Sequence, residues 1–422
     1  MARSKSQPSL ITGLDIGSSA IRIAVGQTGV RADGKKELQI IATAEAPSEG
    51  LQKGVIVSIE EAVSSISSAL EQIERMTGIP ITNVWIGISG MHILSQKTRG
   101  VVAVAKPDGE ISDEDVNRAV DAAKTIAAPL NYEMLHLVPR HFSVDGQLGI
   151  KDPVGMTGIR LEVEAQAIYG LTSHLKNMTK AVYRTSVGID AVVLSVLATA
   201  DAVLNTRQKE LGVLVVDLGG STTTLLVYEG GNVIHTAVLP IGSDHITNDL
   251  ALGLQTSIDV AEKVKIQVGS CINKNVSKQD VIDLFDFGNP THEEVSLLYI
   301  TEIIHARVSE ILERIDKELV SVDQSGMLPA GVIFIGGGSK IGGLVELSKQ
   351  KLRMNAALGF PLDIRTVTEK ANDVSFAPAI GLVKWGSAFS ESSESKRTSS
   401  FLSGGPQKFV ENVRKVFRFL VP

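Results

Sequence analysis

The chain has 422 residues, of which 43% are hydrophobic and 21% charged, as in an ordinary folded globular protein. Its formal net charge of −6 argues against nucleic acid as the main partner, and its one cysteine, Cys271, excludes intramolecular disulfides and cysteine-based zinc sites. No apolar run reaches the ~18 residues of a membrane span, and residues 1–10 lack the apolar centre of a signal peptide.

The first 82 residues have the patterns of a layered α/β domain. Residues 10–26 predict two strands joined at 15-DIGSS-19, and residues 38–46 predict a third strand. A helix is predicted over 58–76, where Ser58 and Glu61 have the spacing of a capping box. Strands followed by a helix indicate a sheet with helices packed on it.

Residues 83–161 have the patterns of a separate insert. Two strands are followed by a predicted helix over 113–127, with Ser112 and Asp115 at capping positions. Residues 163–204 then return to the order strand, helix, strand, helix.

The second half of the chain has a similar succession of predicted strands and helices. Its predicted elements are strands over 211–241, helices over 247–268 and 294–321, a strand at 331–335 and a helix near 377–389. In the helix over 294–321, apolar residues at three- and four-residue steps predict a packed face.

The end of the chain differs in composition. Residues 387–407 contain eight serines, and we expect a flexible linker over 390–407. Residues 408–422 predict an amphipathic helix with four basic residues against one acidic residue. Its apolar side consists of Phe409, Val413, Val416, Phe417 and Leu420, and its basic side of Arg414, Lys415 and Arg418. This pattern favours an anionic membrane surface, and the alternative is a helix docked on its own core.

Two short stretches have the same pattern of Asp, Gly and small hydroxyl residues between apolar strands. They are 15-DIGSS-19 and 217-DLGGST-222. A P-loop runs from a strand into a helix, whereas each of these turns joins two strands and is therefore a hairpin tip. A single tip would be an ordinary turn, but the repetition predicts two tips that hold one phosphate chain through backbone N–H and hydroxyl groups. The glycine-rich loop 336-GGGSKIGG-343 is a third candidate or a plain strand-to-helix turn.

These hairpins, 152-DPVGMTGIRLE-162, 48-SEGLQKGVI-56, 237-AVLPIG-242 and the terminal helix resemble the FtsA family of bacterial actin-like cell-division proteins. The family belongs to the superfamily of actin, heat-shock chaperones and sugar kinases. The resemblance implies an α/β, actin-like two-lobe ATPase fold with an inserted FtsA-type subdomain. It implies lobe 1 at 1–82, 162–195 and 380–389, an insert at 83–161, lobe 2 at 196–247 and 322–379, a helical subdomain at 248–321, a linker at 390–407 and a membrane helix at 408–422.

The resemblance also implies ATP and Mg²⁺ as ligands. The first phosphate loop would be Asp15, Gly17, Ser18 and Ser19, and the second Asp217, Gly219, Gly220, Ser221 and Thr222. Glu262 and Lys265 would contact the adenosine, although without the resemblance they would be a solvated helix ion pair. The adenine and ribose would face Gly336, Gly337, Gly338 and Ser339, and Asp15 and Asp217 would hold Mg²⁺ through water.

The implied role is a peripheral protein on the cytoplasmic face of the inner membrane at the division site. It would self-associate into filaments and bind the FtsZ C-terminal tail at residues 248–321. Departures from the family pattern are Ser221 for Gly, Thr224 for Asp and Arg140 for Gln, and Ser195 stands where related hydrolases have Glu or Gln. We therefore expect weak ATP hydrolysis at most. Two alternatives are a PilM-like type IV pilus assembly protein and a sugar or acetate kinase.

Overall fold

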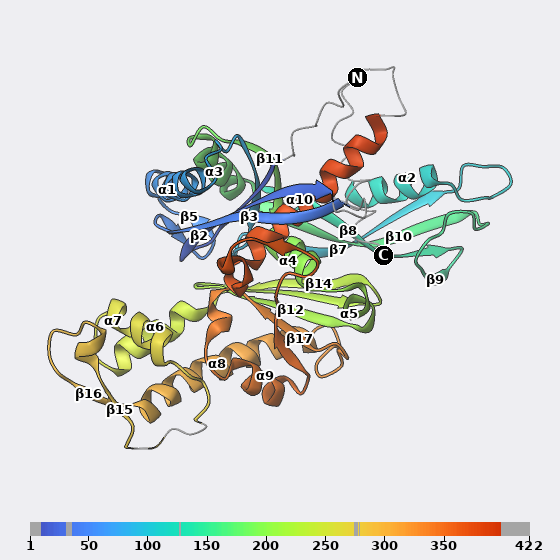
Figure 1. Cartoon of the computed structure of the whole chain (residues 1–422). Helices are drawn as coiled ribbons and strands as arrows, with labels where there is room; N and C mark the ends of the chain where they lie inside the picture. Colours follow the sequence, from blue (N-terminus) through green and yellow to red (C-terminus); the bar gives the residue numbers. More distant parts are fainter. Residues whose placement is uncertain (1–9, 31–35, 126–127, 274–276, 278, 398–422) are drawn as a thin grey trace.

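The computed structural model describes residues 10–30, 36–125, 128–273, 277 and 279–397. Figure 1 shows two lobes: strands β1 to β3 lie in one lobe, and helices α6 to α9 in the other. A smaller unit with α2 and β7 to β10 projects to one side of the first lobe. Each part has its own cluster of buried, mostly aliphatic residues, and the expected α/β class is confirmed.

The first lobe is built on a six-stranded sheet of order β11-β6-β1-β2-β3-β19. The strands are β1 Leu10–Ile16, β2 Ala20–Val30, β3 Lys36–Pro47, β6 Asn83–Ile88, β11 Gly188–Leu194 and β19 Arg365–Thr366. Its helices are α1 Ile59–Thr77, α3 Thr172–Tyr183, α4 Ser195–Val203 and α10 Ala377–Arg397. A small hairpin of β4 Leu51–Gln52 and β5 Val55–Ile56 precedes α1.

The second lobe contains a five-stranded sheet of order β14-β13-β12-β17-β18. The strands are β12 Val213–Leu218, β13 Thr223–Glu229, β14 Asn232–Leu239, β17 Val332–Ile335 and β18 Ala356–Leu358. This order matches β3-β2-β1-β6-β11 of the first lobe, with an antiparallel meander followed by parallel neighbours. The repeat expected from the sequence is therefore a repeat of the fold.

Helices and short elements complete the second lobe. They are α5 Thr206–Leu211, α6 Ser243–Gly253, α7 Ile258–Val268, β15 Val281–Asp283, β16 Glu294–Ser296, α8 Leu297–Val320 and α9 Leu344–Leu352. Its short 3-10 turns are η1 Leu284–Phe287 and η2 Gly337–Lys340, whereas η3 Glu369–Asn372 and η4 Val374–Phe376 pack on the sheet of the first lobe. The expected packed face of α8 is confirmed, because six residues of the predicted apolar stripe are buried: Ile300, Ile304, Val308, Ile311, Ile315 and Leu319.

The single helix expected over 247–268 is two helices. Gln255 lies between α6 and α7 with a φ of 51°, in the left-handed region that cannot continue a right-handed helix. The apolar pattern continues across this break because both helices pack on the same core.

The projecting unit is a four-stranded sheet of order β7-β10-β8-β9, covered by α2. Its elements are β7 Ile93–Ala103, α2 Asp113–Lys124, β8 Tyr132–Val144, β9 Gln147–Ile150 and β10 Arg160–Leu171. The capping box of Ser112 and Asp115 is confirmed. The strand at 83–88 pairs with β1 and β11 in the first lobe, although the sequence analysis assigned it to the insert.

Two further differences concern helix ends. Ser58 is the N-cap residue of α1, but its side chain makes no capping bond, and the Gly50 carbonyl accepts the Ser58 N–H that the Glu61 carboxylate would accept in a capping box. Helix α10 continues to Arg397, so residues 390–397 are helical where a linker was expected. A packed helix extends at little cost beyond its nucleus, which serine-rich composition alone does not reveal. Residues 398–422, including the predicted membrane helix, lie outside the described residues.

Candidate nucleotide-binding site

The two predicted hairpin tips have the same turn. The Gly17 N–H donates to the Ala20 carbonyl at 3.2 Å, and the Gly219 N–H donates to the Thr222 carbonyl at 3.0 Å. Each tip follows the central strand of its sheet, β1 in one lobe and β12 in the other. Tight turns of this kind hold backbone N–H groups in the positions that an anion requires.

The structure brings the two tips together across the lobes. The Ser19 hydroxyl on the first tip donates to the Asp244 carboxylate at the start of α6, at 3.4 Å. A Cβ atom added to Gly220 on the second tip would lie 1.8 Å from Ser19 Oγ. A side chain at residue 220 would displace the Ser19 and Asp244 side chains, so glycine suits the close contact between the lobes.

Two carboxylates, Asp15 and Asp217, lie at the ends of the central strands beside these tips. Burial, and then the neighbouring Asp15 carboxylate, raise the pKa of Asp217 to about 7, against the lowering effect of Arg22. Burial also raises the pKa of Asp15, opposed by Arg22 and by the Ser195 hydroxyl, which donates to Asp15 Oδ1 at 3.1 Å. A pair of desolvated carboxylates in mutual repulsion is an arrangement that a hydrated divalent cation stabilises.

The second tip is tied to the start of α6. The N–H groups of Ser243 and Asp244 donate to the carbonyls of Gly219 and Gly220 at 2.9 and 2.8 Å. The hydroxyl of Ser221 is buried without a hydrogen-bond partner among the described residues. An unpaired buried hydroxyl is costly unless a ligand satisfies it, which fits a phosphate acceptor at this tip.

The other predicted hydroxyl residues of the tips have structural contacts as well. The Ser18 hydroxyl accepts a hydrogen bond from the Gly54 N–H at 2.8 Å and ties the first tip to the β4–β5 hairpin. Thr222 is buried at the base of the second tip.

Glu262 and Lys265 belong to a hydrogen-bonded network in which the lysine is buried. Lys265 is 7% exposed, and its ammonium lies 2.5 Å from Glu262 Oε2 and 2.8 Å from the hydroxyl of Thr247. It also donates to the Ser243 carbonyl at 3.4 Å. This network joins α7 to the start of α6, where Asp244 meets the first tip, so the lysine of the pair is removed from solvent, whereas the Glu262 side chain is 41% exposed.

The glycine-rich loop packs against the second carboxylate. A Cβ atom on Gly336 would lie 2.4 Å from Asp217 Oδ1, and Gly336 has a φ of 85°. A Cβ atom on Gly338 would lie 2.7 Å from Leu218 Cγ, so the loop lies directly on the strand end. The hydroxyl of Ser339 is buried and donates to the Gly336 carbonyl at 2.6 Å, within the loop itself.

Sequence reasoning missed two residues of this site. Arg22 lies opposite Asp15 in the first hairpin, where Thr224 lies opposite Asp217 in the second. Aligning the two hairpins would have singled out Arg22, but Asp244 has no local signal, because only the fold brings it to Ser19. Arg140 lies on β8, and nothing in the structure explains it.

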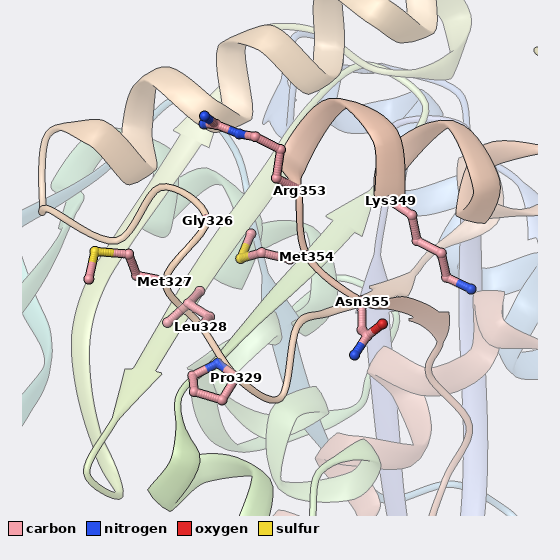
Figure 2. A pocket seen from close by; sticks show the side chains of 8 residues that line it. All are labelled: Gly326, Met327, Leu328, Pro329, Lys349, Arg353, Met354 and Asn355. Atoms are coloured by element: carbon pink, nitrogen blue, oxygen red, sulfur yellow. The ribbon is translucent and has the colours of Figure 1, made fainter.

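A hollow of about 550 Å³ elsewhere in the second lobe shares no residue with this site. Figure 2 shows its lining between the segment before β17 and the end of α9, including Met327, Lys349 and Arg353. Within the described residues, no group of three or more His, Cys, Asp and Glu side chains could hold a metal ion, and no helix has the length and apolar character of a membrane span.

Comparisons with known proteins place the chain in a family. The family description "Cell division protein FtsA" matches residues 214–381, and "SHS2 domain inserted in FTSA" matches residues 90–169. The chain is 34% identical over 377 residues to cell division protein FtsA of Pseudomonas aeruginosa, covering 89% of each chain. It is 36% identical over 376 residues to FtsA of Bacillus subtilis, covering 89% of this chain and 83% of that protein.

Solved structures share the fold at low sequence identity. The PilM–PilN type IV pilus biogenesis complex contains a chain with a TM-score of 0.64 and 16% identity, covering 89% of this chain and 98% of that one. MreB5 of Spiroplasma citri bound to AMPPNP gives a TM-score of 0.52 and 13% identity, covering 92% and 99%. Together with the matched inserted domain, they confirm the expected actin-like two-lobe fold with an FtsA-type insert.

Proposed function

The chain belongs to the FtsA family of cell division proteins, and we propose that it binds ATP between its lobes and links the FtsZ ring to the membrane. The observation that carries the nucleotide proposal is the contact between the two hairpin tips through Ser19, Asp244 and Gly220. Two turns that each expose N–H groups, brought together beside two carboxylates, suit a phosphate chain with its metal ion.

In this proposal the tips bind the phosphates and the second lobe binds the nucleoside. Asp15 and Asp217 hold Mg²⁺ through water, and the buried hydroxyl of Ser221 donates to a phosphate oxygen. The Glu262–Lys265 pair and the loop from Gly336 flank the adenosine. The solved MreB5 structures, whose titles name bound ADP and AMPPNP, support this assignment by their shared fold.

We propose that the site holds ATP and hydrolyses it slowly. Hydrolysis requires a group that orients the attacking water. Ser195 donates to Asp15 and is 1% exposed, and Thr224, which stands in place of the family's carboxylate, is 2% exposed. Neither side chain is an ionisable group that could act as a general base.

The partner sites are proposals of the same kind. Residues 248–321 expose several large apolar side chains that a peptide such as the FtsZ tail would cover, among them Leu252, Ile258, Ile266 and Tyr299. The terminal helix predicted over 408–422 binds the anionic membrane surface, and self-association gives the polymer many such anchors.

We propose a domain division close to the expected one. Lobe 1 keeps residues 83–88, because β6 pairs with β1 and β11, and the insert begins near residue 90, where the family match to the inserted domain also begins. The connection to the terminal helix is placed after Arg397, the last described residue of α10.

Two experiments test the function. ATP affinity is measured for the wild type and for Asp217→Ala, and equal affinity for both proteins overturns the proposed site. Co-sedimentation with vesicles containing anionic lipid compares the full chain with a chain ending at Arg397. Equal binding by both chains overturns the terminal anchor.

The same proteins discriminate the alternatives. Fast ATP turnover with a sugar or acetate acceptor would identify a kinase. The alternative of a type IV pilus assembly protein is supported by the fold shared with the PilM–PilN complex. The sequence identity to that structure is 16%, however, whereas the identities to two FtsA proteins are 34% and 36%.

A further inference from the structure

Two histidines meet where the projecting unit joins the first lobe. His92 lies between β6 and β7, and His174 lies in the first turn of α3, shortly after β10. Their ring centroids are 5.7 Å apart, and the ring planes are inclined by 47°. The backbone also connects these segments, because the His92 carbonyl accepts the Leu171 N–H at 3.1 Å. The two rings therefore come from different parts of the fold and are held close together.

The ring nitrogens at this junction are buried and unpaired. His92 is 4% exposed, and neither of its ring nitrogens has a hydrogen-bond partner among the described residues. The Nδ1 atom of His174 is buried and has no partner in that part of the chain either. Buried polar atoms without partners are costly, so three of them in one place require a physical reason. A ligand shared by the two rings would satisfy one nitrogen of each.

The charge of the His92 ring suits a metal ion as that ligand. Burial, and then the neighbouring His174, lower the pKa of His92 to about 4, so His92 is neutral at pH 7. A neutral imidazole has a lone pair on one ring nitrogen, which is what a metal ion requires of a histidine. His174 is partly exposed and gives an ion a path from solvent.

The separation of the rings fits a shared ion. A zinc ion lies about 2.0–2.1 Å from a histidine nitrogen, and therefore about 3.2 Å from the ring centroid. Two rings that share one ion have centroids about 5.2 Å apart at a tetrahedral angle and up to about 6.4 Å apart in a line. The observed separation of 5.7 Å lies between these values.

Close contacts between glycines fix the backbone beside His92. A Cβ atom built on Gly90 would lie 2.9 Å from Gly54 Cα and 3.1 Å from His92 Nδ1. The Gly54 N–H in turn donates to the Ser18 hydroxyl on the first tip at 2.8 Å. A fixed backbone reduces the entropy that is lost when two ligands are brought to one ion.

We propose that His92 and His174 bind a divalent transition-metal ion of the zinc class, which ties the projecting unit to the first lobe. Water completes the coordination, because the described residues bring no third His, Cys, Asp or Glu side chain to such a site. Imidazole suits zinc, copper and nickel, whereas Mg²⁺ prefers oxygen ligands. This site therefore differs in its metal from the proposed Mg²⁺ site at Asp15 and Asp217, and it does not depend on nucleotide binding.

The test is isothermal titration of the metal-free full chain with ZnCl₂, in the absence of nucleotide. The variants are His92→Gln and His174→Gln. His141→Gln is the matched control, because His141 lies opposite Glu164 within the sheet of the projecting unit, with 3.4 Å between Nε2 and Oε2. We expect one zinc ion per wild-type chain. Either variant should weaken zinc binding by at least the about 10- to 100-fold that loss of an outer-shell partner costs, and the control should bind like the wild type.

A second measurement follows the stability of the chain. Zinc should raise the urea midpoint of the wild type but not that of His174→Gln, because an ion that binds the folded chain stabilises it. The proposal is overturned if the wild type binds no zinc, if either variant binds zinc as tightly as the wild type, or if the control loses as much affinity as the variants. His174→Gln decides the case in which His92→Gln does not fold, since its ring is partly exposed and is one of only two protein ligands.

Discussion

Gly220 is the position at which the addition of one methyl group would disturb the contact between the two hairpin tips. In Gly220→Ala the new Cβ would lie 1.8 Å from Ser19 Oγ and 2.7 and 2.8 Å from the carboxylate oxygens of Asp244. Such distances are far inside van der Waals contact, so the side chains or the tips must move. Gly220 has no positive φ, so the backbone itself accepts alanine and the effect comes from the contact.

The size of the effect follows from the cost of overpacking. One methyl group forced into a packed contact costs about 1–3 kcal/mol. If the cost falls on the arrangement in which the tips meet, ATP affinity decreases roughly 5- to 150-fold. Removing the Ser19 hydroxyl relieves the shortest of the three contacts, so Ser19→Ala should offset part of the loss.

The assay is ATP affinity by titration, with thermal unfolding in parallel, on both single variants and the double variant. Gly29→Ala is the matched control, because its Cβ would lie 3.9 Å from the nearest atom, the Glu37 carbonyl oxygen. We expect a coupling of at least about 0.5 kcal/mol between positions 19 and 220. Wild-type affinity in Gly220→Ala, or strict additivity in the double variant, would refute the contact between the tips as the basis of binding.

Three further expectations follow from buried charged groups. Lys265→Met should weaken ATP binding about tenfold or more, because the nearby carboxylates lose their buried cation. The control is Lys263→Met, at an exposed lysine, which should not change ATP affinity. Equal losses of ATP affinity in the two variants would contradict this prediction. Burial, and then a neighbouring histidine, lower the pKa of His92 to about 4 from 6.5. The unfolded chain therefore binds more protons below 6.5, and urea unfolding should show stability falling towards pH 4 by up to about 1.4 kcal/mol per pH unit, less steeply in His92→Gln. Asp115→Asn should cost about 1–3 kcal/mol in the same assay, because the buried carboxylate accepts two backbone N–H groups, and the exposed Asp121→Asn should cost little.

The sequence predicts the parts of the fold that depend on neighbouring residues. Both hairpins could be identified because each tip and its flanking strands are contiguous. The capping box of Ser112 and Asp115 was predicted correctly for the same reason. The equivalent prediction at Ser58 was wrong, because the Gly50 carbonyl, from a separate loop, accepts the Ser58 N–H that Glu61 would accept in a capping box.

The candidate site was only partly accessible from the sequence. Its glycines and aspartates lie in recognisable turns, but Asp244 and Arg22 gain their meaning from contacts between elements distant along the chain. Ser339 shows the opposite case. It lies in a recognisable loop, yet its hydroxyl donates within that loop, a direction that a sequence pattern cannot determine.

The duplicated scaffold explains how the two lobes can share one ligand without being interchangeable. Both sheets end in the same turn and the same carboxylate, so the metal ion and the phosphates would meet similar groups from either side. The asymmetry lies in the side chains around the tips, because the first lobe supplies Arg22 opposite Asp15, and the second supplies the Lys265 network at the start of α6. A ligand with phosphates at one end and a nucleoside at the other has the same asymmetry. Such a ligand would bind in one orientation only, and it would hold the lobes together because its phosphates contact the tips of both lobes.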